Sequence, residues 1–118
     1  MRVIIAGWRH CRDVALVRKA IQASGFEVTT VISGGARGVD SIGELLACTE
    51  LHVPVVRYHA DWAAHGKAAG PMRNQEMALN ADALVAVSHP ESRGTADMIA
   101  RARRLGLQVY VEHIPAAQ

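Results

Sequence analysis

The chain of 118 residues contains few cysteines and few aromatic side chains, and it has no apolar run long enough to cross a bilayer. Its two cysteines, Cys11 and Cys48, form no C-x-x-C pair and no metal-ligand spacing. This excludes a disulfide-rich secreted scaffold and a zinc ribbon, so we expect two free thiols, with Cys48 in the core. The apolar start, 1–7, is too short for a signal peptide. We expect a single cytoplasmic domain over residues 1–118.

An excess of charge of one sign is also lacking. The net charge is +2, with seven basic and five acidic residues over 1–59 and six of each over 60–118. This even balance disfavours an extended basic face for duplex DNA, so we expect neither a nucleic-acid nor a membrane partner. Eleven of the thirteen basic residues are arginine, the side chain better suited to bidentate contact with phosphate.

Short apolar segments alternate with amphipathic ones along the whole chain. β-Branched and apolar runs predict strands over 2–6, 28–32, 53–58, 82–87 and 107–111. Helical periodicity predicts helices between Asp13 and Gly25 and over 39–52, 71–80 and 94–106. A capping-box match at Ser41 and Glu44 would instead start the second helix just after Ser41. We expect residues 59–70 and the chain beyond 111 to be irregular.

This alternation predicts an α/β fold: a single Rossmann-like three-layer domain with about five parallel strands and helices on both faces. Right-handed crossovers leave few topologies. The long connection over 59–70 allows the chain to cross the sheet, which favours the strand order 3-2-1-4-5 over the flavodoxin-like order.

The most informative segment is the glycine-rich turn Ser33-Gly34-Gly35-Ala36-Arg37-Gly38-Val39-Asp40. It follows a predicted strand and opens a predicted helix, an arrangement that turns backbone N–H groups toward a phosphate. Arg37 adds a cation, and Asp40 either receives ribose hydroxyls or stabilises the helix start. The turn matches neither G-x-G-x-x-G nor a Walker loop. Dehydrogenase and NTPase functions are therefore disfavoured, and no cofactor is expected.

The other loops from strand to helix should meet this turn, because ligands of such sheets bind at the carboxyl ends of the strands. Each of these loops carries an arginine, and helix N-termini and guanidinium groups both favour anions. The predicted ligand-binding residues are Gly7, Trp8, Arg9, Ser33, Gly34, Gly35, Arg37, Gly38, Asp40, Arg73, Asn74, Arg93, Gly94 and Thr95. Together they predict a pocket for a phosphorylated small molecule.

The remaining aromatic and histidine residues of these loops give weaker signals. Trp8 suits contact with a ligand or a second subunit, and Trp62 suits packing. His59, Asp61 and His65 fit no zinc-ligand spacing, so no metal site is expected.

These motifs resemble the SLOG superfamily, in particular its YspA (cpYpsA-related) branch of bacterial and phage proteins. The segments that carry the resemblance are Gly7-Trp8-Arg9, Ser33 to Asp40, Ala60-Asp61-Trp62, Gly66 to Pro71, Arg73-Asn74 with Met77, and Gly94-Thr95. The resemblance implies a Rossmann-like fold, a pocket for a nucleotide derivative and a homodimer.

The Lonely Guy phosphoribohydrolases of this superfamily cleave nucleoside monophosphates at the N-glycosidic bond. The chain is similar to them at Arg73 and at Gly94-Thr95, but Met98 stands where their catalytic glutamate would lie. Asp97 is one residue away, a rotation of roughly 100° on a helix, and 91–93 replaces their double glycine. If the chain is an enzyme, Glu91, Asp97 and Arg73 are its candidate catalytic residues.

Three functions therefore follow from the sequence. The leading one is a binding module that senses or sequesters ADP-ribose or another NAD-derived nucleotide. The first alternative is a nucleoside 5′-monophosphate phosphoribohydrolase. The second is single-stranded DNA binding, because the Smf/DprA proteins of the superfamily, which bind single strands, are similar over 36–41 and at Arg73-Asn74. The near-neutral charge disfavours this last function.

Overall fold

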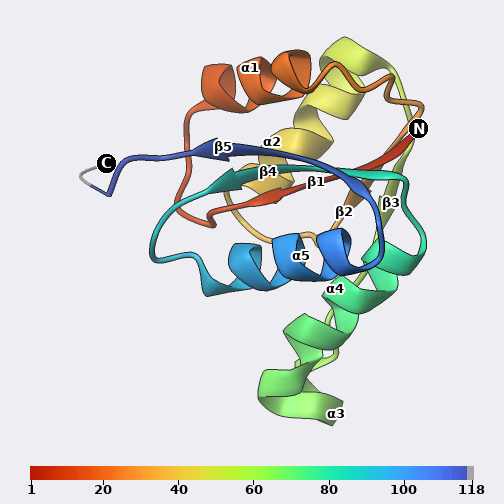
Figure 1. The fold of residues 1–118 in the computed structure, drawn as a ribbon, viewed down its shortest axis with the longest axis vertical. Helices are drawn as coiled ribbons and strands as arrows, with labels where there is room; N and C mark the ends of the chain where they lie inside the picture. The colour runs from red at the N-terminus through yellow and green to blue at the C-terminus, as the bar shows by residue number, and fades with distance from the viewer. Residues whose placement is uncertain (117–118) are drawn as a thin grey trace.

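The structure, a computed structural model, describes residues 1–116. Within them one parallel sheet has five strands in the order β3-β2-β1-β4-β5 (Figure 1). The strands are β1 (Arg2–Gly7), β2 (Thr30–Ser33), β3 (Val55–Arg57), β4 (Ala83–Ser88) and β5 (Gln108–His113). The α-helices are α1 (Val14–Ser24), α2 (Val39–Leu46), α3 (Trp62–His65), α4 (Ala69–Leu79) and α5 (Arg93–Arg104). The predicted fold class and the strand order 3-2-1-4-5 are confirmed.

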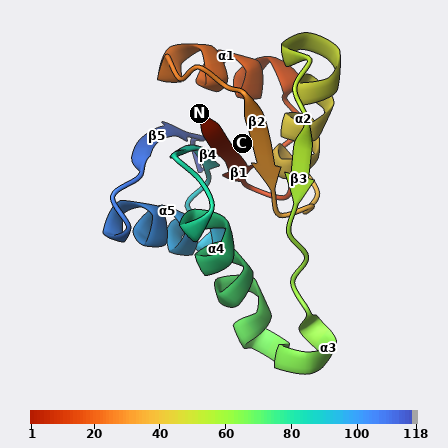
Figure 2. The same ribbon diagram turned by 90° about the vertical axis from the view of Figure 1, so that its right-hand side faces the viewer.

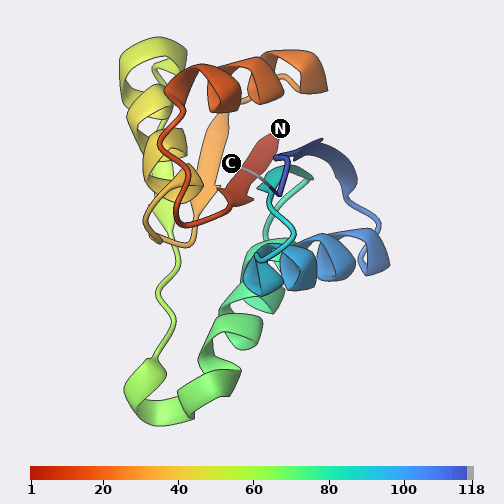
Figure 3. The ribbon, with the colours of Figure 1, turned by 90° about the vertical axis from the view of Figure 1, so that its left-hand side faces the viewer.

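The sheet is covered on both faces, as Figures 1 and 3 show, with α1 and α2 on one side and α4 and α5 on the other. Successive residues of β1 point alternately to the two helical layers. Val3 and Ile5 pack with α1 and α2, whereas Ile4 and Ala6 pack with α4 and α5. Burial on both faces explains why these strands are continuous apolar runs rather than alternating ones.

The ends of α1 follow the sequence signals. The Asp13 carboxylate accepts the Leu16 N–H at 3.0 Å, and Gly25 ends the helix in the left-handed region. The second predicted helix consists of α2 and a π-helical turn, Ala47–Leu51. It begins at Val39, so the alternative start after Ser41 is wrong. The reason is that the Ser41 hydroxyl donates to the Ala36 carbonyl instead of capping a helix.

The connection over 59–70 was expected to be irregular, and here the structure differs. Asp61 caps the short helix α3 by accepting the Ala64 N–H at 3.0 Å, a 3₁₀ turn spans Gly66–Ala68, and α4 begins at Ala69 with Pro71 in its first turn. This segment projects away from the sheet (Figure 2). The expected packing of Trp62 is therefore wrong: its side chain is 60% exposed.

The chain end and Cys48 are two further corrections. β5 continues to His113, two residues beyond the expected end of the strand, and the buried Ile114 donates its N–H to the Ser88 carbonyl at 2.7 Å. Residues 117 and 118 lie outside the described part. Cys11 and Cys48 are free thiols as predicted, but Cys48 is exposed, because it continues the helix face of Ser41 and Leu45, which is also exposed. Among residues 1–116, no helix has the length and apolarity needed to cross a membrane.

Candidate functional site

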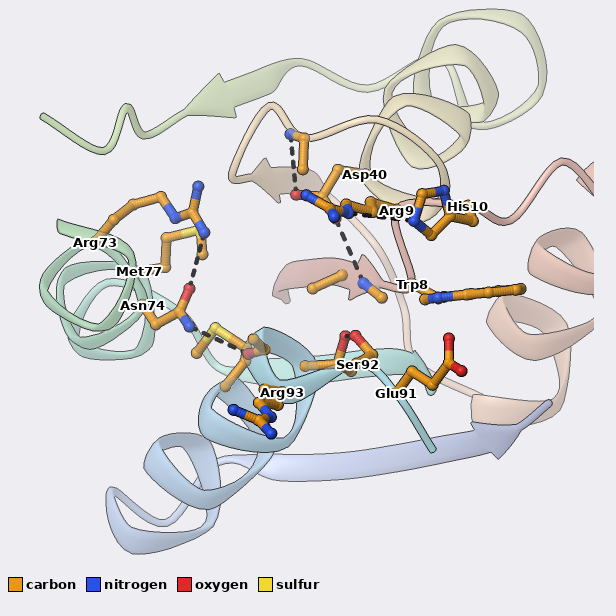
Figure 4. A pocket seen from close by; sticks show the side chains of 16 residues that line it. Trp8, Arg9, His10, Asp40, Arg73, Asn74, Met77, Glu91, Ser92 and Arg93 are labelled. Atoms are coloured by element: carbon orange, nitrogen blue, oxygen red, sulfur yellow. Dashed lines mark hydrogen bonds between the residues drawn. The ribbon is translucent and has the colours of Figure 1, made fainter. Parts of the chain in front are cut away.

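A cleft of about 370 Å³ lies at the carboxyl edge of the sheet (Figure 4). The residues that line it come from the end of β1, from the loops after β1, β2 and β4, and from helices α2, α4 and α5. Its lining consists of Ala6, Gly7, Trp8, Arg9, His10, Ala36, Asp40, Arg73, Asn74, Met77, Glu91, Ser92, Arg93, Gly94, Thr95 and Met98. Residues far apart in the sequence therefore share one concave surface, as is usual for ligand sites of parallel sheets.

The cleft brings together nine of the fourteen predicted ligand-binding residues, which are Gly7, Trp8, Arg9, Asp40, Arg73, Asn74, Arg93, Gly94 and Thr95. Arg37 lies beside the cleft, in an adjoining hollow that it lines with Arg9, His10 and Ala36. The lining of the cleft does not include Ser33, Gly34, Gly35 or Gly38. Of the candidate catalytic residues, Glu91 and Arg73 line the cleft and Asp97 does not.

Some lining residues were not among the predicted ligand-binding residues. Met77 and Met98 form part of the lining although both are only 1% exposed. Their spacing on helices matches an apolar core pattern, so periodicity alone cannot assign them to a site. His10 and Ser92 do carry a signal, because each is a polar residue in a loop that follows a strand.

The first residues of the glycine-rich turn, 33–35, do not line the cleft but hold the turn in place. The buried Ser33 hydroxyl donates to the Glu44 carboxylate at 2.6 Å and accepts the Gly35 N–H at 3.0 Å. Glu44 also pairs with Arg57 of β3. Burial acts to raise the pKa of Glu44, but the hydrogen bonds from Arg57 and Ser33 outweigh it, so the pKa is lowered. A carboxylate that stays ionised thus holds the turn to β3.

Gly38 fixes the turn against the loop after β1. It has a φ of 75°, and a Cβ atom there would lie 2.3 Å from the Trp8 carbonyl oxygen and 2.6 Å from the Arg9 carbonyl carbon. The Val39 N–H donates to the same Trp8 carbonyl at 3.3 Å. Only glycine allows this approach of two backbones, so the positions of Arg9 and Arg37 depend on each other.

Asp40 is the buried acidic group of the cleft, with 5% of its surface exposed. Its two oxygens accept the Gly7 N–H at 3.4 Å and the Ala36 N–H at 3.3 Å. Burial raises the pKa of Asp40 above its ordinary value, although these N–H groups and the charge of Arg73 oppose the shift. Such a carboxyl suits hydrogen bonding to a sugar hydroxyl.

Arg73 reaches the cleft from α4. Its guanidinium donates to the Gly34 carbonyl at 3.1 Å and to the Asn74 side-chain oxygen at 3.4 Å, while its buried Nε has no partner among the described residues. A Cβ atom at Gly34 would lie 3.0 Å from the Arg73 Cζ. The absence of a side chain at Gly34 thus leaves space for Arg73, which lies between the turn and the cleft. Its Nε–H, unpaired among the described residues, is free to donate a further hydrogen bond.

Asp97 does not line the cleft and belongs to a polar network between α4 and α5. Its carboxylate accepts the Asn74 side-chain amide at 2.9 Å and the Arg101 guanidinium at 2.9 Å. Burial acts to raise the pKa of Asp97, but these two hydrogen bonds outweigh it, so the pKa is lowered. A carboxylate held ionised by two donors is poorly suited to act as a general acid.

The start of α5 opens onto the cleft. Ser92 is the N-cap residue, but its hydroxyl pairs with the Thr95 hydroxyl instead of capping the helix. The first-turn N–H groups of Gly94 and Thr95 thus lie at the edge of the cleft without a side-chain cap from Ser92. The positive end of the helix dipole and Arg93 make this edge favourable for an anion.

Comparisons with known proteins agree with the fold and the motifs. A family model described as YAcAr, the YspA, cpYpsA-related SLOG family, matches residues 1–65. The Gene 61 protein of Mycobacterium phage D29 is 34% identical over 117 residues, an alignment that covers 92% of this chain and 93% of the phage protein. No solved structure matches.

Proposed function

The chain belongs to the YspA, cpYpsA-related SLOG family, and from this membership we propose that its cleft binds a phosphorylated, nucleotide-derived ligand. ADP-ribose and other NAD-derived nucleotides are the compounds that we propose first. The protein would sense or sequester this ligand rather than cleave it.

The observation that carries the proposal is the convergence of three arginines on one cleft. Arg9 comes from the loop after β1, Arg73 from α4 and Arg93 from the start of α5. All three line the same cleft of about 370 Å³. Loops collect polar residues in most proteins, but three arginines that line one cleft, together with an open helix N-terminus, favour an anion. The nearby Asp40 carboxyl adds an acceptor for ribose hydroxyls.

The side chains at the start of α5 favour binding over cleavage. Met98 occupies the position of the hydrolase glutamate and presents a thioether, which neither donates nor accepts a proton in hydrolysis. Asp97, the neighbouring acid, is committed to Asn74 and Arg101. The cleft thus holds cations for a phosphate but lacks an acid at the position where the relatives have one.

A phosphoribohydrolase is the second candidate, because the exposed Glu91 does line the cleft. This function requires release of a free base from a nucleoside 5′-monophosphate, and loss of that release in Glu91→Gln. If no base is released from any of the common monophosphates, the hydrolase function is excluded.

Mass spectrometry of the small molecules released on denaturing the purified protein tests the binding function. We expect a nucleotide-like compound, and calorimetry with a panel of ADP-ribose-type ligands should then give a measurable affinity. Arg73→Ala should weaken that affinity by about tenfold or more, because it removes a charge-assisted contact. The control Arg104→Ala, at the exposed far end of α5, should leave it unchanged. An empty protein with a flat calorimetric panel would contradict the proposal.

We further propose that the protein is a cytoplasmic homodimer. Edge strand β3 exposes Val55 and Val56, and the α3–α4 segment exposes Trp62, Met72 and Leu79. Apolar side chains on an edge strand and a neighbouring helix favour pairing with a second copy. Light scattering coupled to size exclusion should give twice the monomer mass, and Val56→Lys should shift it toward the monomer. A monomer mass at all concentrations would overturn this part.

A further inference from the structure

Two hollows, rather than one, lie at the carboxyl edge of the sheet. The cleft of about 370 Å³ adjoins a second hollow of about 510 Å³ that is lined by Arg9, His10, Ala36 and Arg37. Arg9, His10 and Ala36 line both. A ligand that occupies the cleft can therefore continue past Arg9 into the second hollow without leaving the protein surface.

The two hollows differ in chemistry. The cleft mixes cations with the carboxylates of Asp40 and Glu91 and with the amide of Asn74. The lining of the second hollow contains two guanidinium groups and an imidazole, and it includes no acidic side chain among residues 1–116. The cleft offers hydrogen-bond donors and acceptors to a sugar or a base, whereas the second hollow favours the binding of an anion.

The cations of the second hollow are available to a ligand. The ion pairs formed within the described part of the chain are Arg18–Glu50, Arg57–Glu44 and Arg101–Asp97, so they involve neither Arg9 nor Arg37. The Arg9 Nε donates to the His10 Nε2 at 3.3 Å, which orients its guanidinium. By contrast, the Arg73 guanidinium in the cleft already donates to Gly34 and Asn74.

The backbone holds the two arginines of this hollow beside each other. Arg37 directly precedes Gly38, whose α-carbon packs against the backbone of Trp8 and Arg9. The Val39 N–H bond to the Trp8 carbonyl closes the same contact. The pairing of Arg9 and Arg37 is thus a property of the fold and not of two independent surface side chains.

We infer that the ligand carries a second phosphate group, which binds between Arg9 and Arg37 while the nucleoside and its first phosphate occupy the cleft. This inference rests on the proposed function and narrows it to nucleotides with two phosphates. A diphosphate and a nucleoside with phosphates at two separate positions share this chemistry.

Calorimetry with matched ligands at one ionic strength tests the inference. For each of the four common bases, the affinities of the 5′-monophosphate, the 5′-diphosphate and the 3′,5′-bisphosphate are measured, with ADP-ribose added to the adenine series. We expect the second phosphate to strengthen binding about tenfold within at least one series, because it gains charge-assisted contacts. If the 5′-diphosphate binds more tightly than the monophosphate, the two phosphates of the ligand are adjacent. If the 3′,5′-bisphosphate does, they are at separate positions.

The variant Arg37→Ala tests whether the second phosphate binds in the second hollow, because Arg37 lines this hollow and not the cleft. It should weaken binding of the two-phosphate ligands at least fivefold more than binding of the monophosphate. Arg103→Ala removes the same charge from the exposed end of α5 and should change neither. Thermal unfolding of each variant confirms that it folds.

The outcomes separate the inference from the proposed function. If monophosphates bind but the second phosphate adds nothing, or if Arg37→Ala weakens all ligands equally or none, the inference is overturned and the binding function stands. If no ligand of any series binds the wild type, the binding function fails, and the inference fails with it.

Discussion

The Trp8 indole and the His89 imidazole stack face to face, with ring centroids 3.9 Å apart and planes inclined by 10°. Trp8 follows β1 and His89 follows β4, so this contact ties together two loops that line the cleft. His89 is 4% exposed, and its Nδ1 accepts the Glu91 N–H at 3.0 Å. One buried side chain thus sets both the position of the indole and the course of the loop that leads into α5.

Replacing His89 should loosen both loops. We expect His89→Ala to lower the free energy of unfolding by about 2–3 kcal/mol, since it removes an aromatic stack and leaves the Glu91 N–H without its acceptor. His89→Phe keeps an aromatic face and should lose less. Urea unfolding measures the change, and in a Trp62→Phe background the fluorescence reports on Trp8 alone.

The matched control for this change is His113→Ala, at the exposed end of β5. It should change the free energy of unfolding by less than about 0.5 kcal/mol. Equal effects of the two histidine substitutions would show that the stack does not stabilise the loops.

Two glycines with nearly the same backbone conformation allow a second prediction. Gly38 has a φ of 75° and Gly106 a φ of 79°, but a Cβ atom at Gly38 would clash with the Trp8–Arg9 backbone, whereas one at Gly106 has no atom within 4 Å. Gly106→Ala should cost about 1–2 kcal/mol, the penalty for a left-handed alanine. Gly38→Ala should cost clearly more and should weaken ligand binding. Thermal and urea unfolding of both variants measure the difference, and equal costs would contradict the close approach.

The Asn74–Asp97 pair makes a third prediction. Asn74→Asp places a second carboxyl where the amide now donates to Asp97 at 2.9 Å. Two carboxylates at that distance repel, so we expect a loss of about 2 kcal/mol at pH 7. Protonation of either carboxyl relieves the repulsion, and the loss should shrink as the pH falls. Gln22→Glu, on the exposed face of α1, adds the same charge as the control and should show little loss. Urea unfolding at several pH values distinguishes the two.

Features with a local cause could be predicted from the sequence. Asp13 and Gly25 mark the ends of α1 because capping depends on residues within one helical turn. The strand order followed from the alternation of elements and the long connection over 59–70. The placement of Trp8, Arg9 and Arg93 at one edge followed in turn from the strand order.

Features that depend on contacts between distant residues could not be predicted. The burial of Ser33 beneath the turn depends on Glu44 and Arg57. The hydrogen bond that keeps Asp97 ionised depends on Asn74, 23 positions earlier in the chain.

Asp40 and Asp97 have pKa shifts of opposite direction, which gives a prediction about pH. Burial raises the pKa of Asp40, whereas the pKa of Asp97 is lowered by hydrogen bonds that outweigh its burial. A raised carboxyl pKa stabilises the fold below the ordinary value near 3.8, and this contribution is lost as the pH rises through the folded pKa. A lowered pKa stabilises the fold above the ordinary value, and that contribution is lost as the pH falls.

Asp40→Asn should therefore gain stability relative to the wild type as the pH rises from 4, with a slope of at most about 1.4 kcal/mol per pH unit for one proton. Asp97→Asn should lose stability relative to the wild type as the pH rises toward the ordinary value near 3.8, because it gives up an ionised carboxylate with two donors. Urea unfolding of the three proteins between pH 3 and pH 8 measures both differences. If the two variants follow the wild type in parallel, neither carboxyl titrates differently in the folded and unfolded chains. Opposite slopes would show that Asp40 holds its proton to a higher pH than an exposed aspartate, whereas Asp97 releases its proton at a lower pH.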